Sequence, residues 1–309
     1  MDQLVPMILI SILLIFITDI KPVLSYDVDE HAYVLYRKSE LDEIPKNLSK
    51  NNDTWINAAI SLHDALQNDD HYEIIDILIV KNLFHRTSIA DAYYNQFRTQ
   101  LKLDVRSKLF RNFGNLMTAL STPELEFLIE EIHYAIYQYS EMNKNIFLDI
   151  FCRRNYMEID KIKNAYPLYY GKELPEDLLN IPTGDFQSIL IDFTVGILRT
   201  DAFWSFGFGS GKQSPSIYPR DPLSLCTEGV YDYYTKRLHE SLQQKDHQST
   251  TRLMVITVNE HTLHHIIERY KELYHVSLRT QVHHHTEGYF CKSLLILIDV
   301  VSRTDYLFK

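Results

Sequence analysis

The segment IKNAYPLYYGKEL at residues 162–174 decides the fold, because its apolar spacing returns twice elsewhere in the chain. IADAYYNQFRTQL at 89–101 and IIERYKELYHVSL at 266–278 share the pattern. In each copy an isoleucine is followed, in steps of four residues, by a tyrosine, a second aromatic residue and a leucine. Steps of four place side chains on one face of an α-helix, where a core can bury them. A phenylalanine stands twelve residues after each leucine, at Phe113, Phe186 and Phe290. The chain therefore contains three copies of a helical repeat.

Flanking segments extend each copy into the same order of helices. An amphipathic segment comes first, at 55–66, 125–137 and 230–242, and a short apolar helix follows it from Glu73, Asn145 and Arg252. A short helix and a final apolar helix come after each copy. Each unit is thus predicted to hold five helices in about seventy residues, which makes the fold all-α. Pro167 lies inside the third helix of the second unit and is expected to kink or break it.

The second unit, with AYPLYYGKELPEDL followed by GDFQSILID within residues 165–192, resembles the annexin repeat. Arg153 and Arg154 also stand where that family has an arginine after its second helix. The resemblance covers about residues 55–309 and implies annexin-like repeats at 55–123, 124–199 and 225–309, with a Gly/Pro-rich linker at 200–224. Annexins generally have four repeats, and a fourth is not found. The faces that it would close are therefore expected to be open to a partner or a second copy.

The resemblance also implies a membrane-binding surface. Annexins bind acidic phospholipid through calcium held by a Gly-x-Gly-Thr loop and a distant acidic side chain, a set of oxygen ligands that suits this cation. The matching loops at 67–71, 137–142 and 243–248 contain no glycine, and the acidic positions hold Lys108, Ile181 and His285. We expect no cofactor, and calcium only weakly through surface carboxylates. The candidate membrane-facing loop residues are Asn68, Asp69, Asp70, Ser140, Glu141, Gly184, His284 and His285.

The N-terminal region predicts secretion. Residues 4–18 are apolar but short for a membrane span, and small residues precede Tyr26, so 1–25 is expected to be a cleaved signal peptide. An uncleaved anchor is the alternative. Residues 26–54 form a polar lead with glycosylation sequons at Asn47 and Asn52. The three cysteines permit at most one internal disulfide, and Cys226 with Cys291, in one unit, is the pair we expect.

Composition narrows the function further. The net charge of -10 disfavours nucleic-acid binding, which needs a basic surface. No catalytic motif has a supporting context, so we expect no enzyme activity. The third unit holds nine of the 14 histidines, and His261, His264 and His265 share a helical face. A solvated surface is the expected role for them, although transition-metal binding would also suit this spacing. For His284 and His285, at a predicted membrane-facing loop, pH sensing is the alternative, because protonation would add positive charge toward acidic lipid.

The glycine-rich stretch FGFGSGKQS at 206–214 is a candidate phosphate or calcium loop that fails both tests. Phe206 and Gln213 stand where a phosphate loop needs glycine and a hydroxyl residue. Three prolines follow within eight residues, where a calcium loop of the annexin type would be followed by a helix. The stretch is therefore predicted to belong to the connector between the second and third repeats.

These observations predict a secreted, extracellular, non-enzymatic scaffold for protein interaction, with degenerate calcium sites. A parasite or pest effector is one such role. The alternative is a protein that binds acidic phospholipid membrane surfaces and depends weakly on calcium or on pH. A homo-oligomer formed through the faces left open by the missing repeat is a further expectation.

Overall fold

The computed structural model describes residues 52–81, 85–140, 143–151, 154, 156–195, 229–258 and 262–304. The secondary-structure elements in these residues are all helical, which confirms the predicted all-α class. Several predictions lie outside the described residues: the signal peptide at 1–25, the sequon at Asn47, the linker at 200–224, and Glu141, Arg153, Cys226 and His261. No described helix is long and apolar enough to cross a membrane.

Repeat 1 has the predicted five-helix order. Its helices are α3 (Asn52–Gln67), α4 (His71–Ile75) with its π-helical continuation η2 (Asp76–Lys81), α5 (Arg86–Phe97), α6 (Leu101–Lys108) and α7 (Arg111–Ser121). The first helix begins at Asn52, three residues before the predicted start at Trp55. The second sequon therefore falls on the first turn of a helix and not in the loop that its polar neighbours suggested.

Repeat 2 follows directly and corrects one prediction. It consists of α8 (Glu124–Tyr137), α9 (Lys144–Phe151), α10 (Tyr156–Tyr170), α11 (Leu174–Asp177) with the 3-10 turn η4 (Leu178–Asn180), and α12 (Asp185–Val195). Of the kink or break expected at Pro167, the break is wrong, because α10 continues through Pro167 to Tyr170. Pro167 lies in the last turn, and its carbonyl still accepts a hydrogen bond from the Gly171 amide at 2.9 Å.

Repeat 3 consists of α15 (Val230–Gln243), α16 (His247–Thr257), α17 (Thr262–Tyr274), α18 (Leu278–His285) and α19 (Gly288–Thr304). Helix α16 begins five residues before its predicted start at Arg252. The side chain of Asp246 caps it by accepting a hydrogen bond from the Ser249 amide at 3.0 Å.

The backbone shows the repeat as clearly as the side chains do. The residue directly after the third helix of each repeat has a left-handed conformation, at Arg98 (φ 57°), Gly171 (φ 67°) and His275 (φ 56°). The tyrosine of the repeated pattern is fully buried in each unit, at Tyr93, Tyr166 and Tyr270. The three repeats therefore share the same backbone conformation after the third helix and the same buried tyrosine position in the core.

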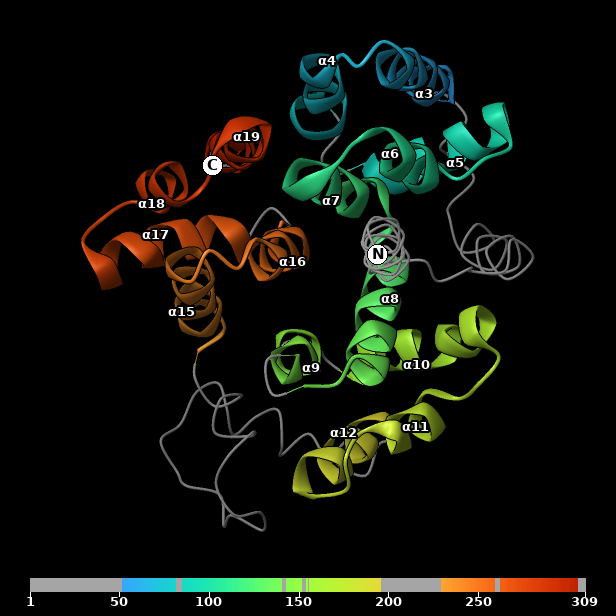
Figure 1. Cartoon of the computed structure of the whole chain (residues 1–309), viewed down its shortest axis with the longest axis vertical. Helices are drawn as coiled ribbons and strands as arrows, with labels where there is room; N and C mark the ends of the chain where they lie inside the picture. The colour runs from blue at the N-terminus through green and yellow to red at the C-terminus, as the bar shows by residue number, and fades with distance from the viewer. Residues whose placement is uncertain are drawn as a thin grey trace, which may run out of the picture.

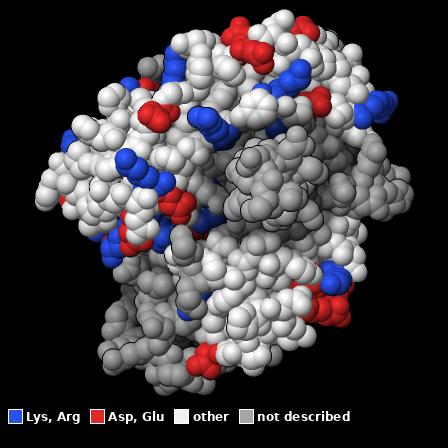
Figure 2. All heavy atoms as spheres, viewed as in Figure 1, with Lys and Arg blue, Asp and Glu red and all other residues white. Residues whose placement is uncertain are grey.

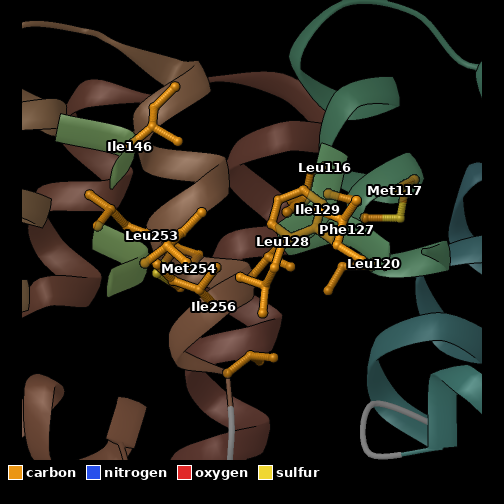
Figure 3. Close-up of a cluster of buried hydrophobic side chains, with 14 of the residues drawn as sticks. Leu116, Met117, Leu120, Phe127, Leu128, Ile129, Ile146, Leu253, Met254 and Ile256 are labelled. Carbon is orange, nitrogen blue, oxygen red and sulfur yellow. The ribbon is translucent and has the colours of Figure 1, made fainter. Parts of the chain in front are cut away.

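The three repeats surround a common centre (Figure 1). Repeat 3 packs against repeat 1, through α16 on α7 and α19 on η2 and α7. The faces of repeats 1 and 3 that meet here therefore cover each other, and the expectation of faces left open by a missing repeat stays a prediction. Buried side chains at the centre of the molecule include Leu116 and Leu120 of α7 and Leu253 and Met254 of α16 (Figure 3). By contrast, α12 of repeat 2 packs mainly against helices of its own repeat.

Candidate functional site

The loops between the first and second helices are tight turns in repeats 1 and 3. Asp69 (φ 53°) and Lys245 (φ 55°) adopt the left-handed conformation at equivalent places. In each loop the backbone amide of the next residue donates a hydrogen bond back to the first helix. The Asp70 amide donates to the Ala65 carbonyl at 2.9 Å, and the Asp246 amide donates to the Ser241 carbonyl at 2.8 Å. The same two aspartates then cap the following helices. Each loop is thus closed by its own hydrogen bonds.

This closure leaves little for calcium to bind. The carbonyls of Asp69 and Lys245 each accept a backbone hydrogen bond at 3.0 Å, and the carboxylate of Asp70 accepts from the Glu73 amide at 3.1 Å. At the position of the family's acidic ligand, Lys108 donates from Nζ to Oε1 of Gln67 at 3.1 Å. An ammonium group beside the loop repels a cation, so the first repeat does not fit the annexin calcium site.

The acidic positions of the other repeats do not fit either. Ile181 is 2% exposed, and its carbonyl accepts from Nε2 of Gln187 at 2.7 Å. Nε2 of His285 lies 3.1 Å from Oε1 of Gln281. Within the part of the chain that the structure describes, no group of three or more His, Cys, Asp or Glu side chains is placed to hold a metal ion.

The remaining predicted loop residues lie at separate helix ends and do not form one site. Asn68 donates to the Asp64 carbonyl at 2.9 Å, and Ser140 accepts from the Asn143 amide at 3.2 Å. Gly184 and His284 are exposed. The structure therefore distributes these residues over the loop ends of three repeats.

Below these loops lies a polar cluster that the sequence analysis missed. In each repeat a histidine one turn before the end of the first helix contacts the repeated tyrosine: His63 with Tyr93, His133 with Tyr166, and His239 with Tyr270. The imidazole also stacks on the next aromatic residue of the pattern, at centroid distances of 4.1, 3.6 and 3.8 Å. A His–Tyr separation of 30, 33 and 31 residues was the signal available in the sequence.

The cluster in repeat 2 shows how it is ordered. Tyr166 donates to Oδ2 of Asp177 at 2.8 Å, because an ionised carboxylate can only accept. Its oxygen therefore accepts from Nδ1–H of His133, 2.7 Å away, which sets the histidine tautomer. Burial lowers the pKa of His133 to about 4, although the nearby Asp177 carboxylate opposes this shift. The imidazole is thus neutral near pH 7.

The other two repeats vary this arrangement. In repeat 1 Tyr93 donates to Oδ2 of Asp104 at 2.7 Å, eleven residues further on, as Asp177 is from Tyr166. In repeat 3 the equivalent position is Gln281, which bonds instead to His285 and to Gln243. The last residue of each first helix is also bonded to the fourth helix, through Gln67–Lys108, Tyr137–Asp177 and Gln243–Gln281. These bonds fix the base of each loop.

A second buried network joins repeat 2 to repeat 3. Asp149 of α9 is fully buried and accepts from Tyr233 OH at 2.7 Å, Arg237 Nε at 3.2 Å and Arg252 Nε at 3.3 Å. Arg252 also bonds Glu131 of α8 at 3.2 Å, and burial raises the pKa of that carboxyl group despite the arginine. This network is a structural tie between two consecutive repeats, formed by residues 84 to 121 positions apart in sequence.

The histidine cluster in α17 is engaged with glutamate. His264 Nε2 lies 3.5 Å from Oε1 of Glu268, and His265 Nδ1 lies 3.9 Å from Oε2 of the same residue. Each histidine is therefore placed to form an ion pair when it is protonated. Cys291 is a buried thiol in the structure. Its expected disulfide partner, Cys226, lies outside the described residues, so that pairing stays a prediction.

An open groove of about 560 Å³ lies between α18 and α19. Its lining includes Arg279, His283, Lys292, Leu295 and Asp299. Arg279 bonds Asp299 at 3.1 Å, so these two opposite charges in the groove neutralise each other. The face of the molecule shown in Figure 2 is similarly mixed, with basic and acidic groups interspersed.

Large apolar side chains are exposed where the first helix meets the second and the fourth meets the fifth. They are Phe110 (74% exposed), Leu179 (64%), Tyr72 (57%), Tyr137 (44%) and Tyr289 (37%). All three repeats contribute to this set. Exposed apolar residues that recur at the same two helix junctions indicate a binding surface more strongly than scattered ones do.

Comparisons with known proteins agree with this architecture. The sequence model of the Annexin family matches residues 130–192, which lie in repeat 2. Annexin A4 of Rattus norvegicus is 22% identical over 231 residues, covering 74% of this chain and 65% of that protein. The chain thus spans just under two thirds of the length of this curated relative.

Solved structures show the same fold. Annexin III superposes with a TM-score of 0.65 at 20% identity, covering 79% of this chain and 93% of that one. Chicken annexin V in complex with Zn²⁺ gives a TM-score of 0.65 at 22% identity, covering 79% and 95%. The fold is therefore the all-α annexin fold. Together the family match, the curated relatives and the solved structures support an annexin-family protein.

Proposed function

We propose that this protein is a non-enzymatic annexin scaffold that docks on a phospholipid membrane surface through its loop ends, without the family's calcium site. The observation that carries the proposal is the set of large apolar side chains exposed at the helix junctions of all three repeats. An exposed phenylalanine or leucine gains free energy when it leaves water for the headgroup boundary.

The polar clusters below the loops support this role. A docking surface is more effective when its side chains are held in place before binding, because less conformational entropy is then lost. The His–Tyr contacts and the bonds from the end of each first helix to the fourth helix hold the loops in this way. Metal coordination is not required for that rigidity.

A vesicle co-sedimentation assay tests the proposal. Wild-type protein should pellet with phospholipid vesicles equally well in calcium and in a chelator. Phe110→Ser should weaken binding by roughly tenfold, since about 1.4 kcal/mol of apolar burial is lost. Met157→Ser is the matched control, because Met157 is 58% exposed but lies at the start of α10, away from these junctions. Binding that requires calcium, or equal binding of the two variants, would contradict the proposal.

We further propose that the protein is secreted, with residues 1–25 removed and Asn47 and Asn52 glycosylated. Expression through a secretory pathway should yield a chain starting near Tyr26 that loses mass after glycosidase treatment. Outside the cell, an extracellular protein is the alternative partner to a membrane surface. A vesicle assay without any pelleting, together with a stable protein complex, would favour that alternative. Binding at pH 5 and at pH 7.5 would show whether the exposed His284 contributes.

A further inference from the structure

Tyr72 and Tyr289 form an exposed aromatic pair at the seam where repeat 1 meets repeat 3. Their ring centroids are 5.5 Å apart at an interplanar angle of 80°, an edge-to-face contact. Tyr72 follows the first residue of α4, and Tyr289 follows the first residue of α19. The pair exists only because the two repeats pack together, since its members are 217 residues apart in sequence.

The pair stands on a less exposed aromatic base. The His71 ring lies 4.7 Å from Tyr289 and 5.2 Å from Phe113, and Phe113 lies 5.5 Å from Tyr289. Phe113 is only 9% exposed, whereas Tyr72 is 57% exposed. The ammonium group of Lys292 sits 3.7 Å from the centroid of Tyr72. We call Tyr72, Tyr289 and Lys292, on the base of His71 and Phe113, the seam cluster.

The chemistry of the seam cluster matches the headgroup layer of a bilayer. Tyrosine has an apolar ring with a polar tip, and such residues collect at the boundary between lipid and water. Lysine can lie with its stem along apolar groups while its charge stays in water. A rigid edge-to-face pair presents this surface with little entropy left to lose.

Charge does not select acidic lipid at this seam. Lys292, Lys108 and Arg111 are the basic residues on the adjoining helix ends, and the acidic ones are Asp69, Asp70, Glu73 and Glu287. The two signs nearly cancel, so Coulomb attraction to an anionic surface is small. Contact through the rings is therefore expected to depend little on salt or on the acidic lipid fraction.

We propose that the seam cluster is a calcium-independent anchor that places Tyr72 and Tyr289 in the headgroup layer of a phospholipid bilayer. This inference rests on the proposed membrane-docking function and names a site for it that two repeats build jointly. It also makes membrane contact depend on the packing of repeat 3 against repeat 1.

The first experiment compares the full chain with the double variant Tyr72→Ala/Tyr289→Ala in a chelator. Phosphatidylcholine vesicles with and without phosphatidylserine are the probes. The double variant should bind each about tenfold more weakly, the factor that corresponds to about 1.4 kcal/mol. Tyr231→Ala is the matched control, because Tyr231 is 38% exposed on α15, and its ring contacts His265 at 4.7 Å, outside the seam cluster.

The outcomes separate this inference from the function on which it rests. Undiminished binding of the double variant overturns the seam anchor and leaves membrane docking intact. Absence of wild-type binding to either vesicle overturns both. Wild-type self-association that the double variant loses, without vesicle binding, would identify a second copy as the occupant and overturn the lipid proposal.

Tryptophan fluorescence at position 289 distinguishes ring insertion from an effect of the substitutions on folding. In the variant Tyr289→Trp, vesicle addition should shift the added fluorescence to shorter wavelength, and brominated lipid should quench it. Tyr231→Trp should show neither change, and subtraction of the parent chain removes the signals of Trp55 and Trp204. Equal spectra for both variants on vesicles would contradict ring insertion at the seam.

Discussion

At the residue scale, one backbone position decides how the third helix of every repeat ends. Arg98, Gly171 and His275 occupy it with left-handed φ angles of 57°, 67° and 56°. A side chain at such an angle brings its Cβ atom close to the following carbonyl, which costs about 1–2 kcal/mol. Glycine avoids that cost, so only repeat 2 has the residue that the geometry favours.

Replacing the residue at this position should therefore have opposite effects in two repeats. Arg98→Gly is expected to raise the free energy of unfolding by about 0.5–1 kcal/mol, because left-handed strain is relieved. Gly171→Ala should lower it by about 1 kcal/mol, although no atom lies within 4 Å of the added Cβ. Denaturant titration with an unchanged slope would measure both, and changes of the same sign would contradict the assignment.

At the element scale, the His–Tyr clusters connect three helices of each repeat. His133 belongs to α8, Tyr166 to α10 and Asp177 to α11, and their hydrogen bonds run through a buried space. The cluster lies one turn before the end of the first helix, so it also supports the start of the loop that follows. A buried hydrogen-bond chain of this kind also makes the fold sensitive to protonation.

Acidification should therefore destabilise repeat 2 through His133. Its pKa of about 4 lies below the ordinary value of 6.5, so the folded protein holds the neutral form. Between these two values the unfolded chain binds more protons, and the free energy of unfolding falls as the pH falls from 6.5 towards 4. His133→Gln should reduce this loss, measured as melting temperature against pH. His284→Gln, on an exposed histidine, should leave it unchanged; equal pH slopes in the wild type and the His133 variant would contradict the cause.

At the scale of the whole molecule, an apolar face and a buried polar network join repeat 3 to the other two repeats. One is the apolar packing of α16 and α19 on repeat 1, and the other is the network around Asp149. Asp149 has no exposed surface, and Arg237 and Arg252 both donate to it. Burying charges is costly unless they are paired, so this network favours one relative placement of the repeats.

Removing that charge should loosen repeat 3. Asp149→Asn is expected to lower the free energy of unfolding by about 3 kcal/mol, since Arg237 and Arg252 both lose the buried carboxylate that they share. Hydrogen exchange should rise in α15 and α16 more than in α3. Asp299→Asn breaks the exposed pair with Arg279 and should cost less than about 1 kcal/mol. Equal effects of the two variants would show that the central network is not a structural tie.

Much of the fold could be predicted from the sequence, because the repeated Ile, Tyr and Leu positions mark helical faces that are buried within each repeat. Residues such as Ile162, Tyr166 and Leu174 are buried as expected. The continuation of α10 through Pro167 and the early start of α16 could not be predicted, since hydrogen bonds at each end of a helix decide where it begins and stops. The His–Tyr–acid clusters were visible as a spacing but not recognised, because polar residues on a helix usually face solvent.

The sequence by itself therefore determined the helices, their threefold repetition and the loss of the annexin calcium motif, since these depend on spacing along the chain. Only the tertiary structure decided that repeat 3 covers repeat 1, that Asp149 joins repeats 2 and 3, and that Tyr72 meets Tyr289. The physical reason is that contacts within a repeat follow from helical periodicity. Contacts between repeats depend on how complete helical faces pack, and residues such as Tyr72 and Tyr289, 217 positions apart, meet there without a local signal.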